Sequence, residues 1–149
     1  MSDALRIGLA RKRDIDAILQ LEVSAFPAPW RREFFESELR ASGRFNLAAK
    51  RGDRLVGYLF AMWFLDEMHI NKIAVVESER RRGVARQLMD HCFKFAAMNR
   101  IRSISLEVRQ SNLSAQEFYA SLAFRPAYVR PRYYPDGESA VVMLRELET

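Results

Sequence analysis

Apolar and polar residues follow two periods along this chain, and these periods predict alternating strands and helices. Alternating or continuous apolar stretches predict seven strands, at residues 5–10, 45–50, 55–65, 67–75, 104–108, 127–132 and 139–147. Apolar positions spaced three and four apart predict four helices, which begin at Asp14 and span 32–40, about 83–99 and 114–122. For the last helix, Ser114 and Glu117 have the spacing of a capping box. We expect an α/β fold built on a mixed sheet.

The strand at 67–75 changes phase in its middle. Met68 and Ile70 share one face, whereas Ile73 and Val75 have the opposite parity. A β-bulge near Asn71 would produce this flip, although a strand buried on both faces would show no phase at all. A right-handed crossover through the third helix makes strands 67–75 and 104–108 parallel neighbours.

The third helix begins with a run of arginines, Arg80-Arg81-Arg82-Gly83-Val84-Ala85-Arg86. A helix start carries unpaired N–H groups and the positive end of the helix dipole, so cations are disfavoured there. An anion such as a phosphate would resolve the conflict, because N–H groups and guanidinium groups would converge on it. A solvated basic helix start is the alternative interpretation.

Composition limits the class of protein. The chain has 149 residues, 49% hydrophobic and 29% charged, which is typical of one globular domain spanning residues 1–149. The apolar run at 55–65 is too short to cross a bilayer, and no apolar signal segment follows Met1, so we expect a cytoplasmic protein without membrane contact. The net charge of +5 comes mainly from arginine, which suits a phosphate-bearing partner, either a nucleotide-like cofactor or a nucleic acid.

Several motifs together resemble the GCN5-related N-acetyltransferase (GNAT) superfamily. Arg80, Gly83 and Ala85 match its acetyl-CoA signature Gln/Arg-x-x-Gly-x-Gly/Ala, between a bulged strand and a helix. Within the superfamily the chain is most similar to the ribosomal-protein-alanine N-acetyltransferases, through the segments 71–75, 106–109, 111–112, 118–119, 122–124 and 132–135. Two departures from the family pattern are Ala123, where glycine is usual, and the charged residues His69 and Lys72.

The resemblance implies acetyl-CoA as co-substrate. His69 and His91 have no partners at the spacing of metal ligands, so we expect no metal site. The backbone of Arg81–Arg86 would hold the pyrophosphate, and Ile73, Ala74 and Val75 would hold the pantetheine arm. One of their N–H groups would face the thioester oxygen. Asn112 resembles an asparagine that contacts the cofactor in this family, although a residue at a helix start needs no such role.

Glu107 and Tyr119 are the candidate catalytic residues. Glu107 shares a strand face with two serines, which leaves room for a substrate or a water, so its carboxylate is a candidate base. Tyr119, expected at the border of the apolar stripe of the last helix, is the candidate acid for the departing thiolate. The alternatives are an exposed acidic residue and a packing tyrosine, and Glu67 or His69 would replace Glu107 if strand 67–75 faces the amine. Cys92 is interpreted as a packing residue.

We therefore expect an enzyme that acetylates a protein N-terminal amine by direct transfer in a ternary complex, with the N-terminal alanine of a small-subunit ribosomal protein as the substrate that the resemblance implies. The loop 26–30 and the turn 133–137 would line the peptide groove or merely seal the core, and acidic residues such as Asp136 would receive a basic substrate. Acetylation of lysine or of a small amine is the nearest alternative. A rival hypothesis is a non-catalytic basic module that binds nucleic acid or ribosomes, although we expect no specific nucleic acid.

Overall fold

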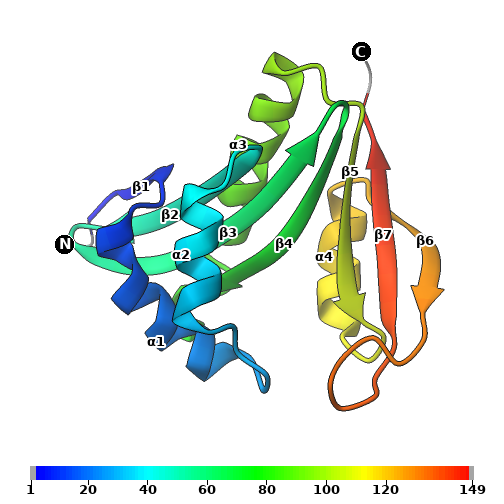
Figure 1. Ribbon diagram of the computed structural model, residues 1–149, viewed down its shortest axis with the longest axis horizontal. Helices are drawn as coiled ribbons and strands as arrows, with labels where there is room; N and C mark the ends of the chain where they lie inside the picture. Colours follow the sequence, from blue (N-terminus) through cyan, green and yellow to red (C-terminus); the bar gives the residue numbers. More distant parts are fainter. Residues whose placement is uncertain (1–2, 148–149) are drawn as a thin grey trace.

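One mixed sheet of seven strands organises the computed structural model, which describes residues 3–147 (Figure 1). The strands are β1 Leu5–Leu9, β2 Arg44–Arg51, β3 Arg54–Phe64, β4 Glu67–Val75, β5 Ser103–Arg109, β6 Arg125–Arg130 and β7 Ala140–Glu146. Their order across the sheet is β1-β2-β3-β4-β5-β7-β6. The α-helices are α1 Ile15–Ala25, α2 Arg32–Arg40, α3 Val84–Met98 and α4 Leu113–Ser121, with short 3-10 turns at Lys12–Asp14 and Glu77–Glu79. The predicted fold class is confirmed.

The helices cover both faces of the sheet. Helices α1 and α2 lie across β2 to β4 on one face, and α3 and α4 lie behind the other (Figure 1). Each helix buries the apolar stripe that its sequence period predicts, so two cores form, one on each side of the sheet. On the α1–α2 side, Phe35 packs edge-on against Tyr58 and Phe60. On the α3–α4 side, Leu88, Met89 and other apolar side chains are fully buried.

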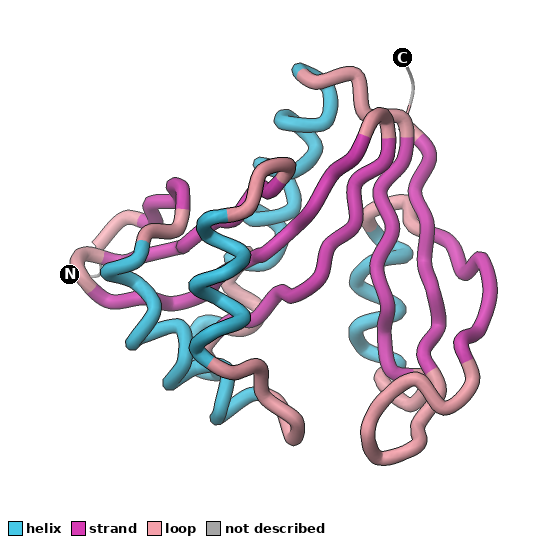
Figure 2. The backbone as a smooth tube through the Cα atoms, in the orientation of Figure 1, coloured by secondary structure: helices cyan, strands magenta, loops and turns pink. Residues whose placement is uncertain are grey.

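A β-bulge interrupts β4 at the predicted place. Lys72 pairs with Phe60 of β3 and Ile70 pairs with Ala61, so Asn71 is the extra residue between them. The predicted parallel pairing of β4 with β5 is also confirmed, but it covers only Glu67–Ile70 against 103–106. Past this point, and within residues 3–147, β4 pairs with β3 alone. Strands β4 and β5 separate here and leave an opening in the sheet (Figure 2).

The start and the buried face of α4 differ from the prediction. The capping box at Ser114 is wrong: α4 begins at Leu113, because the carboxamide oxygen of Asn112 accepts a hydrogen bond from the backbone N–H of Ala115 at 3.1 Å and caps the helix earlier. Tyr119 does not lie at the border of the apolar stripe. It is the buried residue of this helix, because its ring packs against Phe118 and Phe124 at centroid distances of 5.1 and 5.8 Å.

None of the helices within residues 3–147 combines the length and the apolar composition that a membrane crossing requires.

Candidate active site

A cleft of about 650 Å³ opens where β4 and β5 part. Its floor consists of residues 69–73 of β4 and 106–109 of β5. Its walls come from the loop after α1, helix α4 and the loop between β6 and β7. These two loops lie at the same end of the molecule, one on each side of the opening (Figure 2). Of the residues that the sequence predicts for the site, the cleft is lined by Ile73, Glu107, Asn112 and Tyr119.

Glu107 projects into this cleft with its carboxylate held by neighbours. The backbone register pairs His69 with Ser105, two residues before Glu107 on the same face of β5. The imidazole therefore bridges the two side chains: Nδ1 lies 2.7 Å from the Ser105 hydroxyl, and Nε2 lies 2.7 Å from Oε2 of Glu107. The Arg130 guanidinium approaches the other carboxylate oxygen at 3.6 Å. The Glu107 side chain is only 12% exposed, so the alternative of a solvent-exposed acidic residue does not hold.

Tyr119 lies across the same cleft, on α4. No hydrogen bond joins its hydroxyl to residues 3–147, and this oxygen is not among their fully buried unpaired polar atoms, so it can donate to a ligand in the cleft. Burial raises the pKa of the Tyr119 phenol above its ordinary value, with a smaller contribution from Cys92. The phenol therefore carries its proton at neutral pH, as a general acid must.

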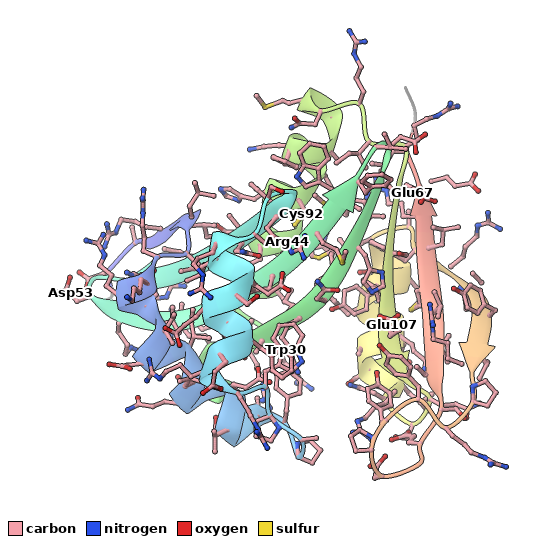
Figure 3. The ribbon with its side chains drawn as sticks, viewed as in Figure 1. Trp30, Arg44, Asp53, Glu67, Cys92 and Glu107 are labelled. Atoms are coloured by element: carbon pink, nitrogen blue, oxygen red, sulfur yellow. The ribbon has the colours of Figure 1, made fainter. Side chains whose placement is uncertain are left out.

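Glu67 and His69, the two rivals for the base, have different surroundings. His69 lies in the cleft beside Glu107, as described above. Glu67 is exposed and pairs with Ser103 at the closed end of the β4–β5 pair, away from the opening (Figure 3). Of the two, only His69 contacts Glu107.

Cys92 packs in the core under α3, where burial raises the pKa of its thiol to about 12. The thiol is therefore protonated at neutral pH and poorly suited to act as a nucleophile. Across residues 3–147, His, Cys, Asp and Glu side chains do not form a group of three or more that could hold a metal ion.

The arginine loop presents backbone N–H groups at the start of α3. Gly83 is the N-cap with a φ of 83°, and Arg81 also lies in the left-handed region at 65°. The first helical hydrogen bond runs from the N–H of Gln87 to the Gly83 carbonyl at 3.0 Å. Within the described chain, the N–H groups of Val84, Ala85 and Arg86 have neither a side-chain cap nor a backbone acceptor.

Four exposed cations surround these N–H groups, namely Arg80, Arg81, Arg82 and Arg86. Arg82 is partly neutralised by Glu79, whose oxygen lies 3.2 Å from its guanidinium. Free N–H groups, the helix dipole and guanidinium groups together fit a pyrophosphate. The chain therefore has the donors that a nucleotide-like co-substrate requires at this position.

The remaining predicted residues connect the two regions. Ile73–Val75, the last part of β4, runs from the cleft toward the arginine loop. Ile73 lines the cleft, whereas the Ala74 side chain is buried beneath α1 and Val75 is half-buried. Asn112 lines the cleft as well, but its oxygen is occupied as the cap of α4.

Sequence reasoning assigned no site role to three cations in or beside the cleft, which are Lys72, Arg109 and Arg130. Lys72 stood out only as a charge on an otherwise apolar strand. Arg109 stood out only as part of the family-like segment 106–109. Arg130 gave no signal, because it contacts a residue more than twenty positions away.

Comparisons with known proteins agree with this geometry. The family model described as "Acetyltransferase (GNAT) family" matches residues 15–124. The [ribosomal protein bS18]-alanine N-acetyltransferase of Salmonella typhimurium is 31% identical to the chain, with 92% of this chain and 94% of that protein covered.

Solved structures show the same architecture. The ribosomal-protein-S18-alanine N-acetyltransferase of Escherichia coli superposes with a TM-score of 0.91 at 28% identity, covering 98% of this chain and 96% of that one. Arabidopsis thaliana NAA60, solved in complex with acetyl-CoA, superposes at 0.88 with 20% identity and coverage of 97% and 99%. The chain belongs to the GNAT family and is an N-acetyltransferase that uses acetyl-CoA.

Proposed function

We propose that this enzyme acetylates the N-terminal amine of a protein by direct transfer from acetyl-CoA, with both substrates bound together. The observation that carries the proposal is the parting of β4 and β5, because it opens one cleft that contains Glu107 and Tyr119 beside the free edge of β4. An amine that enters this cleft meets a candidate base and a candidate acid at the same point.

The residues of the chain divide the chemistry as follows. The N–H groups at the start of α3 and the arginines around Gly83 hold the pyrophosphate of acetyl-CoA. Beyond the bulge, β4 no longer pairs with β5 within residues 3–147, so peptide N–H groups of Ile73–Val75 are available to an extended ligand and to the thioester oxygen. Bound acetyl-CoA supplies an activated acetyl group to the amine.

Proton transfer is assigned to two side chains. The amine nitrogen attacks the thioester carbonyl carbon, and its proton passes to the Glu107 carboxylate directly or through one water. The carbon–sulfur bond then breaks, and the leaving thiolate takes the proton of the Tyr119 phenol. An α-amine has a pKa near 8, about two units below that of lysine, so a carboxylate suffices as the base.

The substrate class follows from the walls of the cleft and from the relatives. Aromatic side chains flank the opening on both sides, namely Phe26 and Trp30 in the loop after α1 and Tyr133 and Tyr134 in the loop after β6. This lining suits a short stretch of extended peptide. The names of the relatives specify an alanine of ribosomal protein bS18 or S18 as the acceptor. We propose an N-terminal alanine of a small-subunit ribosomal protein as the acceptor, which places the reaction in the cytoplasm.

Mass spectrometry of acetylated peptides tests this proposal. Three peptides are incubated with the enzyme and acetyl-CoA: an alanine-starting basic peptide, its N-terminally blocked form, and a blocked peptide with added lysines. Acetylation of the first peptide alone, at its α-amine, is the expected result. Acetylation of a lysine side chain would instead favour the alternative acceptor and overturn the substrate assignment.

The rival hypothesis of a non-catalytic basic module is wrong, because the chain belongs to the GNAT family and is an N-acetyltransferase.

A further inference from the structure

Each strand that flanks the opening carries one cation just beyond the point where β4 and β5 separate. On β4, Lys72 follows Ile70 and the bulge, where pairing with β5 ends. On β5, Arg109 is the last residue of the strand, three positions beyond Leu106. Both side chains line the cleft, and each reaches toward the aromatic loop on its own side.

Lys72 binds the wall formed by the loop after α1. Its ammonium lies 3.8 Å from the centre of the Phe26 ring and 5.1 Å from that of Trp30. A cation over an aromatic face is attracted by the ring, most strongly where water is excluded. The Lys72 side chain is only 13% exposed, so these contacts are largely dry.

A buried carboxylate fixes Lys72 in this position. Glu22 on α1 is fully buried, and its Oε2 lies 3.0 Å from the Lys72 ammonium. The same oxygen accepts a hydrogen bond from the backbone N–H of Trp30 at 2.8 Å, and the other oxygen accepts from the Tyr58 hydroxyl. A buried charge is costly unless it is paired and hydrogen-bonded, so Glu22 ties α1, β3, β4 and the loop into one arrangement.

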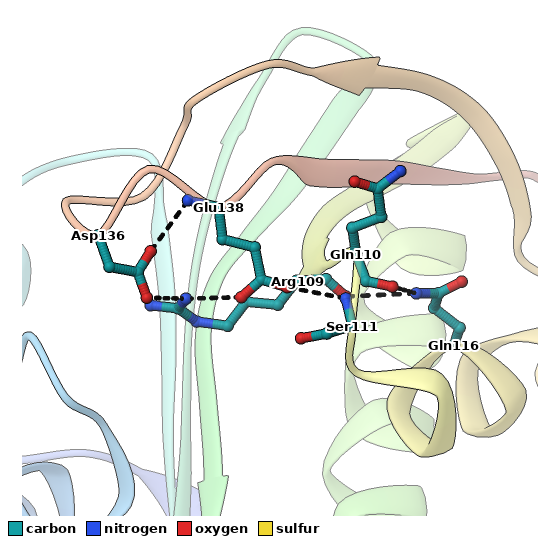
Figure 4. Close-up of polar contacts among 6 residues, drawn as sticks. All are labelled: Arg109, Gln110, Ser111, Gln116, Asp136 and Glu138. Carbon is teal, nitrogen blue, oxygen red and sulfur yellow. Dashed lines mark hydrogen bonds and ion pairs between the residues drawn. The ribbon is translucent and has the colours of Figure 1, made fainter.

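Arg109 is anchored to the opposite wall by two carboxylates, those of Asp136 and Glu138 (Figure 4). One guanidinium nitrogen lies 2.8 Å from both Asp136 Oδ2 and Glu138 Oε1, and the guanidinium carbon lies 4.1 Å from the centre of the Tyr134 ring. Glu138 also accepts a hydrogen bond from the Ser111 N–H at 2.8 Å. The loop between β6 and β7 is therefore attached to the end of β5.

Both cations are paired with carboxylates of the protein, so their charges are already compensated. Asp136 is likewise engaged by Arg109, which argues against the expectation that it receives a basic substrate. We propose that Lys72 and Arg109 are positioning residues that hold the two aromatic walls of the cleft at the separation that a peptide acceptor requires. This inference rests on the proposed function, because it treats those walls as the peptide-binding surface.

Steady-state kinetics with the alanine-starting peptide tests the assignment. Lys72→Met and Arg109→Met keep much of the aliphatic side chain and remove the cation. Each should raise the KM for the peptide at least about tenfold while kcat and the KM for acetyl-CoA change less than about threefold, because loosened walls weaken acceptor binding. Lys72→Arg and Arg109→Lys keep the cation, so their KM for the peptide should stay close to that of the parent enzyme.

Two variants away from the cleft serve as matched controls. Lys94 is an exposed lysine on α3, and Arg125 is an exposed arginine on β6 that pairs with Glu146. Lys94→Met and Arg125→Met should leave all three kinetic constants unchanged. If these control variants raise the KM for the peptide as much as Lys72→Met and Arg109→Met do, overall charge controls peptide binding. That result would overturn the proposal.

Tryptophan fluorescence provides a readout that does not depend on activity. In a Trp63→Phe background, Trp30 is the remaining tryptophan of the two in the sequence. Lys72→Met should increase quenching of Trp30 by acrylamide, because the ring loses its contact with the strand, whereas Arg109→Met should not. Unchanged quenching with Lys72→Met would contradict the anchor at that wall.

A double variant separates positioning from stability. Lys72→Met leaves the buried Glu22 without its counterion, so the single variant is expected to be less stable. Glu22→Gln combined with Lys72→Met removes both charges and should melt closer to the parent while the peptide KM stays high. A peptide KM restored to the parent value in the double variant would overturn the role of Lys72. If the parent enzyme acetylates no peptide, the proposed function fails instead, which is a separate result.

Discussion

The Nε2 atom of His69 lies 2.7 Å from Oε2 of Glu107, across the parallel junction of β4 and β5. A neutral imidazole has one donor and one acceptor nitrogen. A carboxylate can only accept, so in the neutral ring Nε2 carries the hydrogen and donates a hydrogen bond to Glu107, and Nδ1 accepts one from the Ser105 hydroxyl, 2.7 Å away. The ring thereby orients Glu107, whose other oxygen Arg130 approaches at 3.6 Å.

Glu107→Gln should lower kcat by about 10²–10⁴-fold, because the amide keeps the shape of the side chain but cannot accept the amine proton. The KM for acetyl-CoA should stay within about threefold, since Glu107 does not belong to the pyrophosphate site. Initial rates measured with a thiol-reactive dye give both constants. Glu67→Gln, at the closed end of the same strand pair, is the control and should retain parent activity.

Tyr119→Phe should reduce kcat by about 10–100-fold through loss of the proton donor. Its melting temperature should change little, because the ring keeps its packing against Phe118 and Phe124. Burial places the pKa of the phenol above its ordinary value of 10, so the acid form persists below pH 10 and ionisation of Tyr119 should not reduce the rate between pH 8 and pH 10. If the rate of the parent enzyme falls between pH 8 and pH 10 and that of Tyr119→Phe does not, the phenol ionises in this range, which would contradict the prediction.

Gly83→Val should weaken acetyl-CoA binding at least about tenfold, because the φ of 83° costs a β-branched residue about 1–2 kcal/mol and the N–H groups at the start of α3 would be reoriented. An added Cβ has space, with its nearest neighbour at 4.0 Å, so the backbone conformation and not a clash causes the effect. Isothermal titration with CoA measures it. Binding equal to the parent would remove Gly83 from the co-substrate site.

Ala123→Gly should stabilise the protein by about 0.5–1 kcal/mol and leave kcat unchanged. Ala123 has a φ of 67°, a conformation that costs a residue with a Cβ about 1–2 kcal/mol, partly offset by the greater freedom of glycine in the unfolded chain. This is the position where the family usually has glycine. A thermal melt should move upward by about 1–4 °C; a lower melting temperature would show that the methyl group packs favourably.

The elements of the fold and the bulge could be predicted because local patterns encode them. The phase change between Ile70 and Ile73 located the bulge correctly, and the crossover rule made β4 and β5 neighbours. The register of that pair carries no local signal, so the contact between His69 and Glu107 was not predicted and His69 was considered only as a rival base. The start of α4 was misplaced because Asn112 caps it more effectively than Ser114.

The anchors of the cleft walls escaped sequence reasoning for a different reason. Glu22 is a polar residue on an otherwise amphipathic helix, and the pattern alone would place it in solvent. Its partners Tyr58 and Lys72 lie 36 and 50 positions further along the chain. Arg109 and Glu138, which pair at the other wall, are 29 positions apart. Pairings of this kind follow from the assembled tertiary structure, so no spacing rule reveals them.

If the amine and the thioester meet in one cleft between β4 and β5, a single molecule should fill both binding regions. Such a molecule is a conjugate in which the sulfur of CoA is joined through an acetyl group to the α-amine of the alanine-starting peptide. The conjugate should bind at least about 100-fold more tightly than CoA alone, because both halves are held at once. A conjugate that binds no more tightly than CoA, measured by titration calorimetry, would contradict direct transfer at this site.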